Sequence, residues 1–164
     1  LLSACTDAGS PGSKEPKPFT DFDVLTIDQS ACLFDCPVFE VKIFHDGQVR
    51  HSGPTFEQTG GPDELRIDRR GLTQIAQALR DARFDEMRDR YQDEADGCEF
   101  TASDMSTLSL SMSRGRGFRN KNVVLYTGCL GPAIPTERID TLVKAIDRVT
   151  GTGALLERRK QVHQ

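Results

Sequence analysis

Two hairpin signals restrict the fold of this chain more than any other feature of its sequence. Residues 38–44 (VFEVKIF) and 48–53 (QVRHSG) flank Asp46-Gly47, a pair typical of hairpin turns because both residues tolerate a positive φ. The turn is either a two-residue turn or a three-residue loop with Gly47 in the left-handed region. Residues 105–113 (MSTLSLSMS) alternate apolar side chains with Ser and Thr, and residues 122–126 (NVVLY) follow them after a turn at 114–117 (RGRG). The sequence therefore predicts two antiparallel hairpins.

The segments around these hairpins predict one more strand and two helices. Residues 23–29 (DVLTIDQ) predict a strand before the first hairpin. Residues 68–84 predict a helix with Asp68 as its N-cap, and a second helix begins near Thr136 and ends near Gly151. Each helix has an apolar stripe on one face, formed by Leu72, Ile75, Ala76 and Leu79 in the first and by Ile139, Leu142, Val143 and Ile146 in the second.

The order of these elements (β-β-β-α-β-β-α) indicates an α+β fold. We expect a two-layer architecture in which two helices pack on one face of an antiparallel sheet of about five strands. Residues 21–156 are long enough to form a single domain with a hydrophobic core. In the acidic stretch at 85–96, Met87 and Tyr91 are candidate core contacts.

The first residues predict where the protein resides. Leu2-Ser3-Ala4-Cys5 is similar to the lipobox of bacterial lipoproteins, which predicts a residual signal peptide at 1–4 and a lipidated Cys5. Residues 5–20 predict a disordered tether and residues 157–164 a tail. Because Thr6 rather than Asp follows the cysteine, the resemblance favours the outer membrane, with the domain facing the periplasm. The membrane is then a partner through the lipid, and the net charge of −4 gives no reason to expect nucleic acid.

Four cysteines remain beyond Cys5. An even number in an oxidising compartment predicts two disulfides, for which four cysteines allow three pairings. Folding the second hairpin brings together the segments before residue 105 and after residue 126, which contain Cys98 and Cys129. We therefore favour Cys98–Cys129 with Cys32–Cys36, and the other pairings stay open.

The pair Cys32 and Cys36 also raises the question of redox chemistry. A redox pair typically has Cys-x-x-Cys at a helix N-terminus, whereas here three residues separate the cysteines and a strand pattern follows. A zinc site would need four reduced ligands, which an oxidising compartment disfavours. We interpret the pair as a staple that fixes a loop, with a thiol–disulfide oxidoreductase using Cys32 and Cys36 as the alternative.

Residues 31–53 (ACLFDCPVFEVKIFHDGQVRHSG) resemble the signature of a bacterial family known only as domain of unknown function 6438. In that family Cys-x-Gly-x-Cys-Pro-x-Tyr precedes a strand, Asp-Gly and a second strand. Further matches at Asp104, at 125–132 (LYTGCLGP) and at 135–147 (PTERIDTLVKAID) extend the resemblance over about residues 24–155. Phe34 stands where the family has Gly and Phe39 where it has Tyr; if that glycine needs a positive φ, the cysteine loop has a different shape here. The resemblance implies one domain, a cell-envelope setting and no known catalytic residues.

Metal sites find little support in the sequence. His45, His51 and His163 are expected to be exposed and not to share a metal. The acidic stretch does not fit a calcium loop, because aligning Gly97 with the invariant glycine places Gln92 and Ser103 at the first and last ligand positions. We expect no metal, although a weaker calcium site in residues 85–97 stays open.

The turn of the second hairpin carries a cationic cluster. Four cationic side chains cluster at this tip of the hairpin: Arg114, Arg116, Arg119 and Lys121. Besides an ordinary charged turn, such a cluster is typical of an ionic contact with anionic lipid or with an acidic envelope protein.

The sequence predicts a lipid-anchored cell-envelope protein that is a non-catalytic binding or accessory module with structural disulfides. It contains no Walker loop, no nucleophile elbow and no dinucleotide motif opening a helix, and we expect no cofactor. A small-ligand carrier is a further alternative, which a closed apolar pocket would favour and a filled core would exclude.

Overall fold

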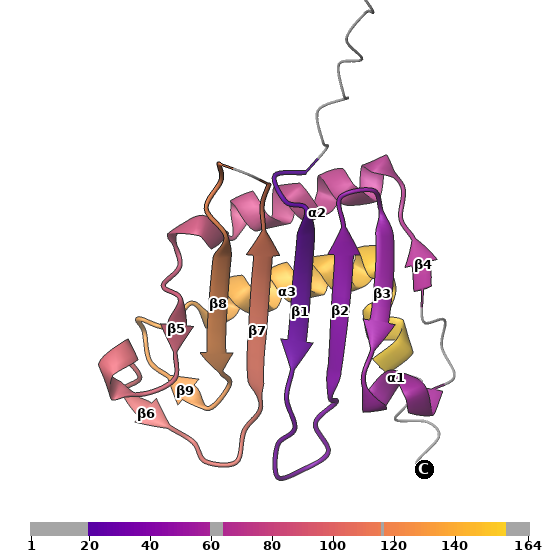
Figure 1. The fold of residues 1–164 in the computed structure, drawn as a ribbon. Coiled ribbons are helices and arrows are strands. Elements are labelled where there is room, and N and C mark those ends of the chain that lie inside the picture. The colour runs from indigo at the N-terminus through magenta and orange to yellow at the C-terminus, as the bar shows by residue number, and fades with distance from the viewer. Residues whose placement is uncertain (1–19, 60–63, 116, 157–164) are drawn as a thin grey trace, which may run out of the picture.

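The structure is a computed structural model that describes residues 20–59, 64–115 and 117–156 (Figure 1). The predictions for the signal-peptide residues 1–4, for Cys5, for nearly all of the tether and for the tail at 157–164 lie outside the described residues, as does Arg116. The described part of the chain contains an α+β arrangement of strands and helices.

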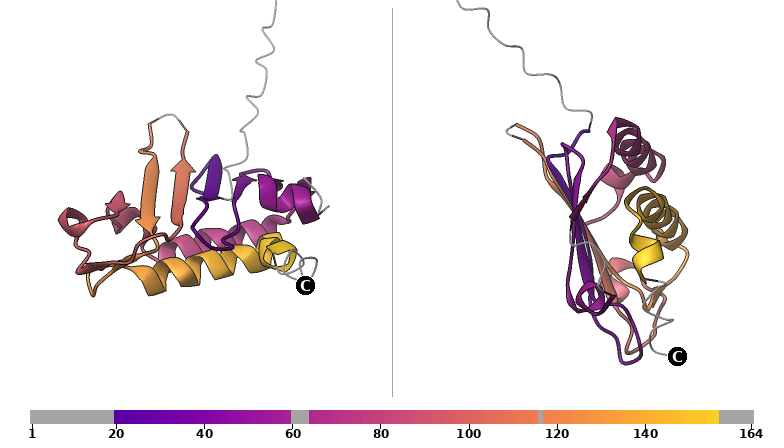
Figure 2. Two further views of the ribbon diagram at one scale, coloured as in Figure 1. Left: turned by 90° about the horizontal axis from the view of Figure 1, so that it is seen from below. Right: turned by 90° about the vertical axis from the view of Figure 1, so that its right-hand side faces the viewer.

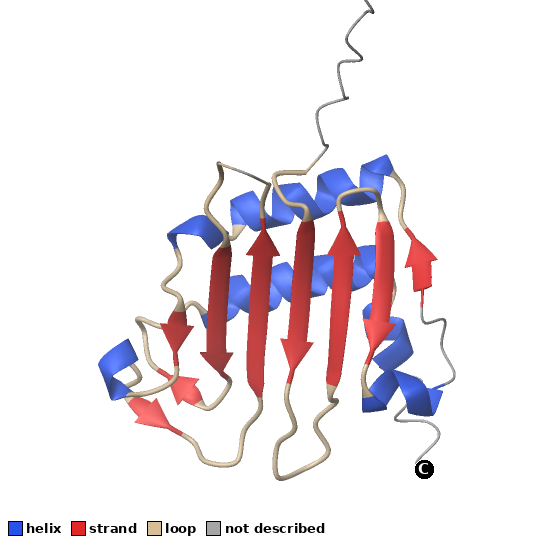
Figure 3. Cartoon of the chain, viewed as in Figure 1, coloured by secondary structure: helices blue, strands red, loops and turns tan. Residues whose placement is uncertain are grey.

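A seven-stranded sheet forms the centre of the domain, in the order β4-β3-β2-β1-β7-β8-β5 (Figure 3). Neighbouring strands are antiparallel except β5 and β8, which are parallel, and β6 and β9 form a separate antiparallel pair. The strands are β1 (Val24–Gln29), β2 (Phe39–Phe44), β3 (Gln48–Ser52), β4 (Glu64–Arg66), β5 (Arg90–Tyr91), β6 (Phe100–Thr101), β7 (Thr107–Ser113), β8 (Lys121–Tyr126) and β9 (Cys129–Leu130).

Helices α2 (Arg69–Asp81) and α3 (Thr136–Thr150) pack on the same face of this sheet (Figure 2). Shorter helical segments are α1 (Pro54–Thr59), η1 (Phe84–Glu86), η2 (Glu94–Asp96) and residues 152–156. None of the helices among the described residues combines the length and the apolar character that crossing a membrane requires.

The hydrophobic core lies between the sheet and the two long helices. Alternate residues of the central strands face the helices because side chains alternate between the two faces of a strand. The predicted apolar stripes of α2 and α3 supply the other side of the core. The deeply buried members of this cluster include Leu25, Val41, Ile43, Val49, Ile75, Leu110, Val123, Ile139, Leu142 and Ile146.

The turn of the first hairpin explains the register of β2 and β3. Gly47 has a φ of 89°, and its N–H donates to the carbonyl of Phe44 at 2.9 Å, so the turn is the three-residue loop with a left-handed glycine. A Cβ on Gly47 would lie 2.3 Å from the carbonyl oxygen of Ile67. Only glycine therefore fits here, where the segment before α2 crosses the turn.

The caps of the helices follow the sequence signals. The side chain of Asp68 accepts a hydrogen bond from the N–H of Gly71 at 2.8 Å, which confirms the predicted N-cap of α2. Helix α3 ends at Gly151 in the left-handed conformation, as glycine at this position permits. Met87 and Tyr91, the candidate core contacts of the acidic stretch, are both buried.

The α+β class is confirmed, but the predicted sheet of about five antiparallel strands is only loosely matched. Strands β4 and β5 extend it at its two edges, and β5 makes the sheet mixed because it runs parallel to β8. These edge strands have three and two residues, too few for a period-two pattern to be recognised in the sequence.

The prediction that all three histidines are exposed is wrong for His51. Its side chain is 3% exposed, its Nε2 lies 3.0 Å from the hydroxyl of Thr152, and its ring packs edge-on against Phe56. Burial lowers the pKa of His51, which favours the neutral ring. The helical segment at 152–156, which the sequence did not predict, contributes Thr152 and so accounts for the difference. His163 lies outside the described residues.

Candidate functional site

Both disulfides lie at one end of the sheet, which we call the disulfide end and define as residues 30–38, 92–106 and 127–135. In Figure 1 it is the lower edge, where the β1–β2 loop and strands β6 and β9 lie. Cys32 and Cys36 are bonded with their Cα atoms 5.6 Å apart, and Cys98 and Cys129 with theirs 5.1 Å apart. The predicted pairing of the four cysteines is confirmed.

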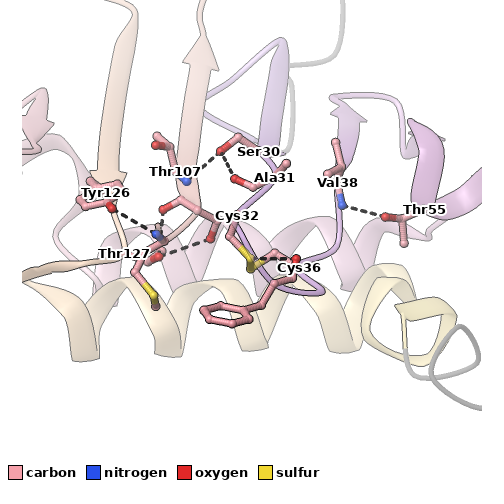
Figure 4. The surroundings of a disulfide bond; sticks show 12 residues. Ser30, Ala31, Cys32, Cys36, Val38, Thr55, Thr107, Tyr126 and Thr127 are labelled. Atoms are coloured by element: carbon pink, nitrogen blue, oxygen red, sulfur yellow. Dashed lines mark hydrogen bonds between the residues drawn. A yellow bond between two sulfur atoms is a disulfide. The ribbon is translucent and has the colours of Figure 1, made fainter. Parts of the chain in front are cut away.

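Hydrogen bonds join the cysteine loop to the start of β7 and to the segment before it (Figure 4). The N–H of Ser30 donates to the carbonyl of Thr107 at 3.0 Å, and the N–H of Thr107 donates to the hydroxyl of Ser30 at 2.9 Å. The N–H of Leu33, inside the disulfide loop, donates to the carbonyl of Asp104 at 3.1 Å. The disulfide loop is therefore attached to the neighbouring loop through its backbone as well as closed on itself.

The hydroxyl of Tyr126, the last residue of β8, bonds to the segment before β7 from the other side. It accepts a hydrogen bond from the N–H of Met105 at 3.1 Å and donates one to the carbonyl of Ala102 at 2.9 Å. Gly128 approaches so closely that an added Cβ would lie 2.3 Å from the Ala102 oxygen and 3.1 Å from Cγ of Met105. The three segments are therefore joined to one another through their backbones.

This surface exposes most of the large apolar side chains that face solvent. Among the described residues six such side chains are exposed, and five of them belong to the disulfide end. The sixth, Phe118, lies in the turn between β7 and β8 at the opposite end of the sheet. The exposed fractions at the disulfide end are 69% for Leu33, 77% for Phe34, 62% for Phe100, 42% for Met105 and 45% for Leu130.

The local geometry explains why these side chains stay exposed. Leu33 and Phe34 occupy the interior of a disulfide loop with only three residues between its cysteines, which keeps them out of the core. Phe100 and Leu130 are direct cross-strand partners in the small β6–β9 sheet, so their side chains project from the same face of it. Apolar side chains gathered in this way are typical of interaction surfaces.

The disulfide end is negatively charged. Its three segments contain six carboxylates and no Lys, Arg or His. Asp93 and Asp96 form ion pairs with Arg90, which lies just before the second segment. The other carboxylates of that segment, Glu94, Glu99 and Asp104, have no cationic partner among the described residues.

The acidic stretch at 85–97 forms intramolecular ion pairs. Asp85 binds Arg114, Glu86 binds Arg83, and Asp89 binds Lys121. Within the described ranges no three His, Cys, Asp or Glu side chains come together as a metal site would require. The open question of a calcium site in 85–97 gains no support from this geometry.

Two members of the predicted cationic cluster have partners inside the molecule. Arg114, with 14% of its side chain exposed, makes two 2.8 Å hydrogen bonds to the carboxylate of Asp85. Lys121 contacts Asp89 at 2.6 Å, which lowers the pKa of that carboxyl. Arg119 is exposed. An external ionic contact of this cluster, Arg116 included, stays a prediction.

The same region is hollowed into a depression of about 920 Å³. Its lining includes the Asp85–Arg114 and Asp89–Lys121 pairs, and it is open to solvent. This polar depression differs from the closed apolar pocket that a small-ligand carrier would need.

Cys32 and Cys36 lie in a loop that a strand follows. Strand β2 begins at Phe39, so no helix begins directly after Cys36, and the first turn of α1 contacts the chain at Val38. Sγ of Cys32 lies 3.3 Å from the carbonyl oxygen of Phe34. Among the described residues only Arg83 and Asp104 have a positive φ without being glycine, so Phe34 needs no left-handed conformation.

Sequence reasoning identified the four cysteines but missed the apolar surface around them. The signal for Leu33 and Phe34 was present, since two large apolar residues enclosed by a short disulfide loop cannot reach a core. Phe100, Met105 and Leu130 gave no comparable signal, because they lie in segments too short or irregular for a periodic pattern.

A family model described as a domain of unknown function (DUF6438) matches residues 23–150. The match extends from β1 to the end of α3, so it includes both disulfides and the whole disulfide end. No curated protein and no solved structure matches this sequence.

Proposed function

This chain belongs to the family described as domain of unknown function DUF6438, and we propose that it is a lipid-anchored, non-catalytic binding module of the cell envelope whose disulfide end contacts a partner. The observation that carries the proposal is the gathering of five exposed large apolar side chains on loops closed by two disulfides. Loops fixed in this way lose little conformational freedom on binding, which favours affinity.

The position of the N-terminal segment fits this proposal. The carbonyl of Asp21 accepts a hydrogen bond from Arg114, and the carbonyl of Asp23 accepts one from the N–H of His45. Residues 21–23 therefore lie at the turns opposite the disulfide end (Figure 1). An anchor at Cys5, attached to the outer membrane as its sequence context suggests, would join the domain at the end opposite the disulfide end and so leave that end free of the attachment.

Site-specific photocrosslinking in living cells tests the proposal. A photoreactive phenylalanine analogue is placed at Phe34, and at Phe118 as the matched control, because these side chains are 77% and 74% exposed at opposite ends of the domain. We expect a discrete crosslinked adduct from position 34 that position 118 does not give. The same pattern at both positions, or no adduct at position 34, would refute the assignment of the surface.

The lipid anchor and the non-catalytic role have separate measurements. Replacing Cys5→Ala should move the protein from the membrane fraction to the soluble fraction of the cell envelope. A redox titration should place the Cys32–Cys36 potential below about −300 mV, as for structural disulfides. A potential near those of known oxidants, with turnover of a disulfide substrate, would instead support the oxidoreductase alternative.

A further inference from the structure

The disulfide end combines apolar and acidic groups, and from this combination we propose the chemistry of its partner. The partner is a polypeptide segment in which large apolar side chains are flanked by Lys or Arg. This inference rests on the proposed function, since it specifies what the same surface binds.

Leu33, Phe34 and Met105 are exposed apolar side chains of the disulfide end. The first two project from the disulfide loop. The N–H of Leu33 donates a hydrogen bond to the carbonyl of Asp104, the residue that precedes Met105. Burying such side chains against a partner contributes most of the favourable free energy of a contact. The partner must therefore supply apolar side chains of its own.

Glu94, Glu99 and Asp104 give the disulfide end its uncompensated negative charge. All three are exposed, and the chain offers them no cationic partner among the residues that the structure describes. By contrast, Asp85, Asp89 and most other acidic side chains of residues 85–96 have such partners. Uncompensated charge around an apolar surface selects a partner of opposite charge and increases the association rate.

Two other occupants fit these charges less well. An anionic lipid surface would be repelled by the three carboxylates, which disfavours it as the ligand. A second copy that paired through the same end would place this acidic surface against itself, because a two-fold contact uses the same patch on both subunits and the patch contains no Lys, Arg or His. A cationic and apolar polypeptide has neither conflict.

Fluorescence anisotropy with two peptides tests the proposal on the full chain with its disulfides intact. The first peptide alternates Leu and Phe with Ser and carries Lys at both ends, and its twin has Glu in place of every Lys. We expect the Lys peptide to bind about tenfold more tightly than the Glu peptide, the size expected for a few exposed charge pairs. The difference should shrink between about 0.15 M and 1 M NaCl, where the Debye length falls from about 8 to 3 Å.

Matched variants assign the effect to the disulfide end. The double variant Glu99→Gln/Asp104→Asn should lose most of the preference for the Lys peptide. Asn is chosen because it tolerates the left-handed backbone of Asp104, whose φ is 63°. Asp21→Asn/Asp23→Asn removes two charges at the opposite end and should keep the preference. Leu33→Ser/Phe34→Ser should abolish binding of both peptides, whereas Phe118→Ser should not.

Several outcomes would overturn the inference. With the peptides, these are equal or tighter binding of the Glu peptide, or no binding of either peptide. The chain could instead bind neutral liposomes through Leu33 and Phe34, or it could self-associate in a way that Leu33→Ser/Phe34→Ser abolishes. If the adduct from position 34 still forms in cells while the Lys peptide shows no preference, only the partner chemistry is wrong. If that adduct is absent, the proposed function fails as well.

Discussion

The two disulfides should differ in how much they stabilise the fold. Cys98 and Cys129 are separated by 31 positions and Cys32 and Cys36 by 4. A disulfide stabilises mainly by restricting the unfolded chain, and the loop-closure relation gives about 3.7 kcal/mol for the long loop and about 2 kcal/mol for the short one. Replacing each pair by alanine should therefore lower the free energy of unfolding more at Cys98 and Cys129.

Urea unfolding followed by circular dichroism at neutral pH measures both variants against the native chain. The short-loop variant should keep the slope of the unfolding transition and lose adduct formation at position 34, because the disulfide holds the exposed loop rather than the core. The reasoning is refuted if removing Cys32–Cys36 costs as much stability as removing Cys98–Cys129. It is also refuted if the long-loop variant loses less than about 1 kcal/mol, well below the loop-closure value.

Three further substitutions test the fold. Gly47→Ala should cost at least about 2 kcal/mol, measured as a lower Tm, because the residue has a positive φ and its new Cβ would meet the carbonyl of Ile67. Arg114→Lys should cost about 1 to 2 kcal/mol in urea unfolding, since one lysine nitrogen cannot bond the carboxylate of Asp85 and the carbonyls of Asp21 and Arg119 at the same time, as the guanidinium does. Burial raises the pKa of Asp147 to about 6, so its contribution to stability is present below about pH 4 and is lost as the pH rises through about 6. Asp147→Asn should flatten this dependence when urea midpoints are compared at pH 4 and pH 7.

The elements with a strong periodic pattern could be predicted from the sequence. The first hairpin followed from Asp46-Gly47 between two alternating segments, and α2 from an N-cap and an apolar stripe. The Cys98–Cys129 pairing followed from the second hairpin, because pairing of β7 with β8 brings the flanking segments together. In each case local chemistry and long-range contact favour the same structure.

The remaining features depend on tertiary contacts that no local pattern carries. Strand β5 exists because the chain after α2 returns beside β8, and its two residues have no strand signal of their own. His51 is buried because a segment a hundred residues later supplies Thr152. The internal pairing of Arg114 with Asp85 also joins distant segments, so composition alone suggested a more exposed cationic turn than the structure contains.

The short disulfide loop keeps the apolar side chains of Leu33 and Phe34 exposed to water. An open loop with Leu33 and Phe34 could fold back over the neighbouring segments and cover part of its apolar area. The bond between Cys32 and Cys36, together with the hydrogen bond from Leu33 to the carbonyl of Asp104, opposes that rearrangement. This disulfide should therefore favour binding more than it stabilises the fold. A loop that is already ordered loses little conformational entropy when a partner binds. The disulfide that stabilises the fold less is therefore the one on which recognition should depend more.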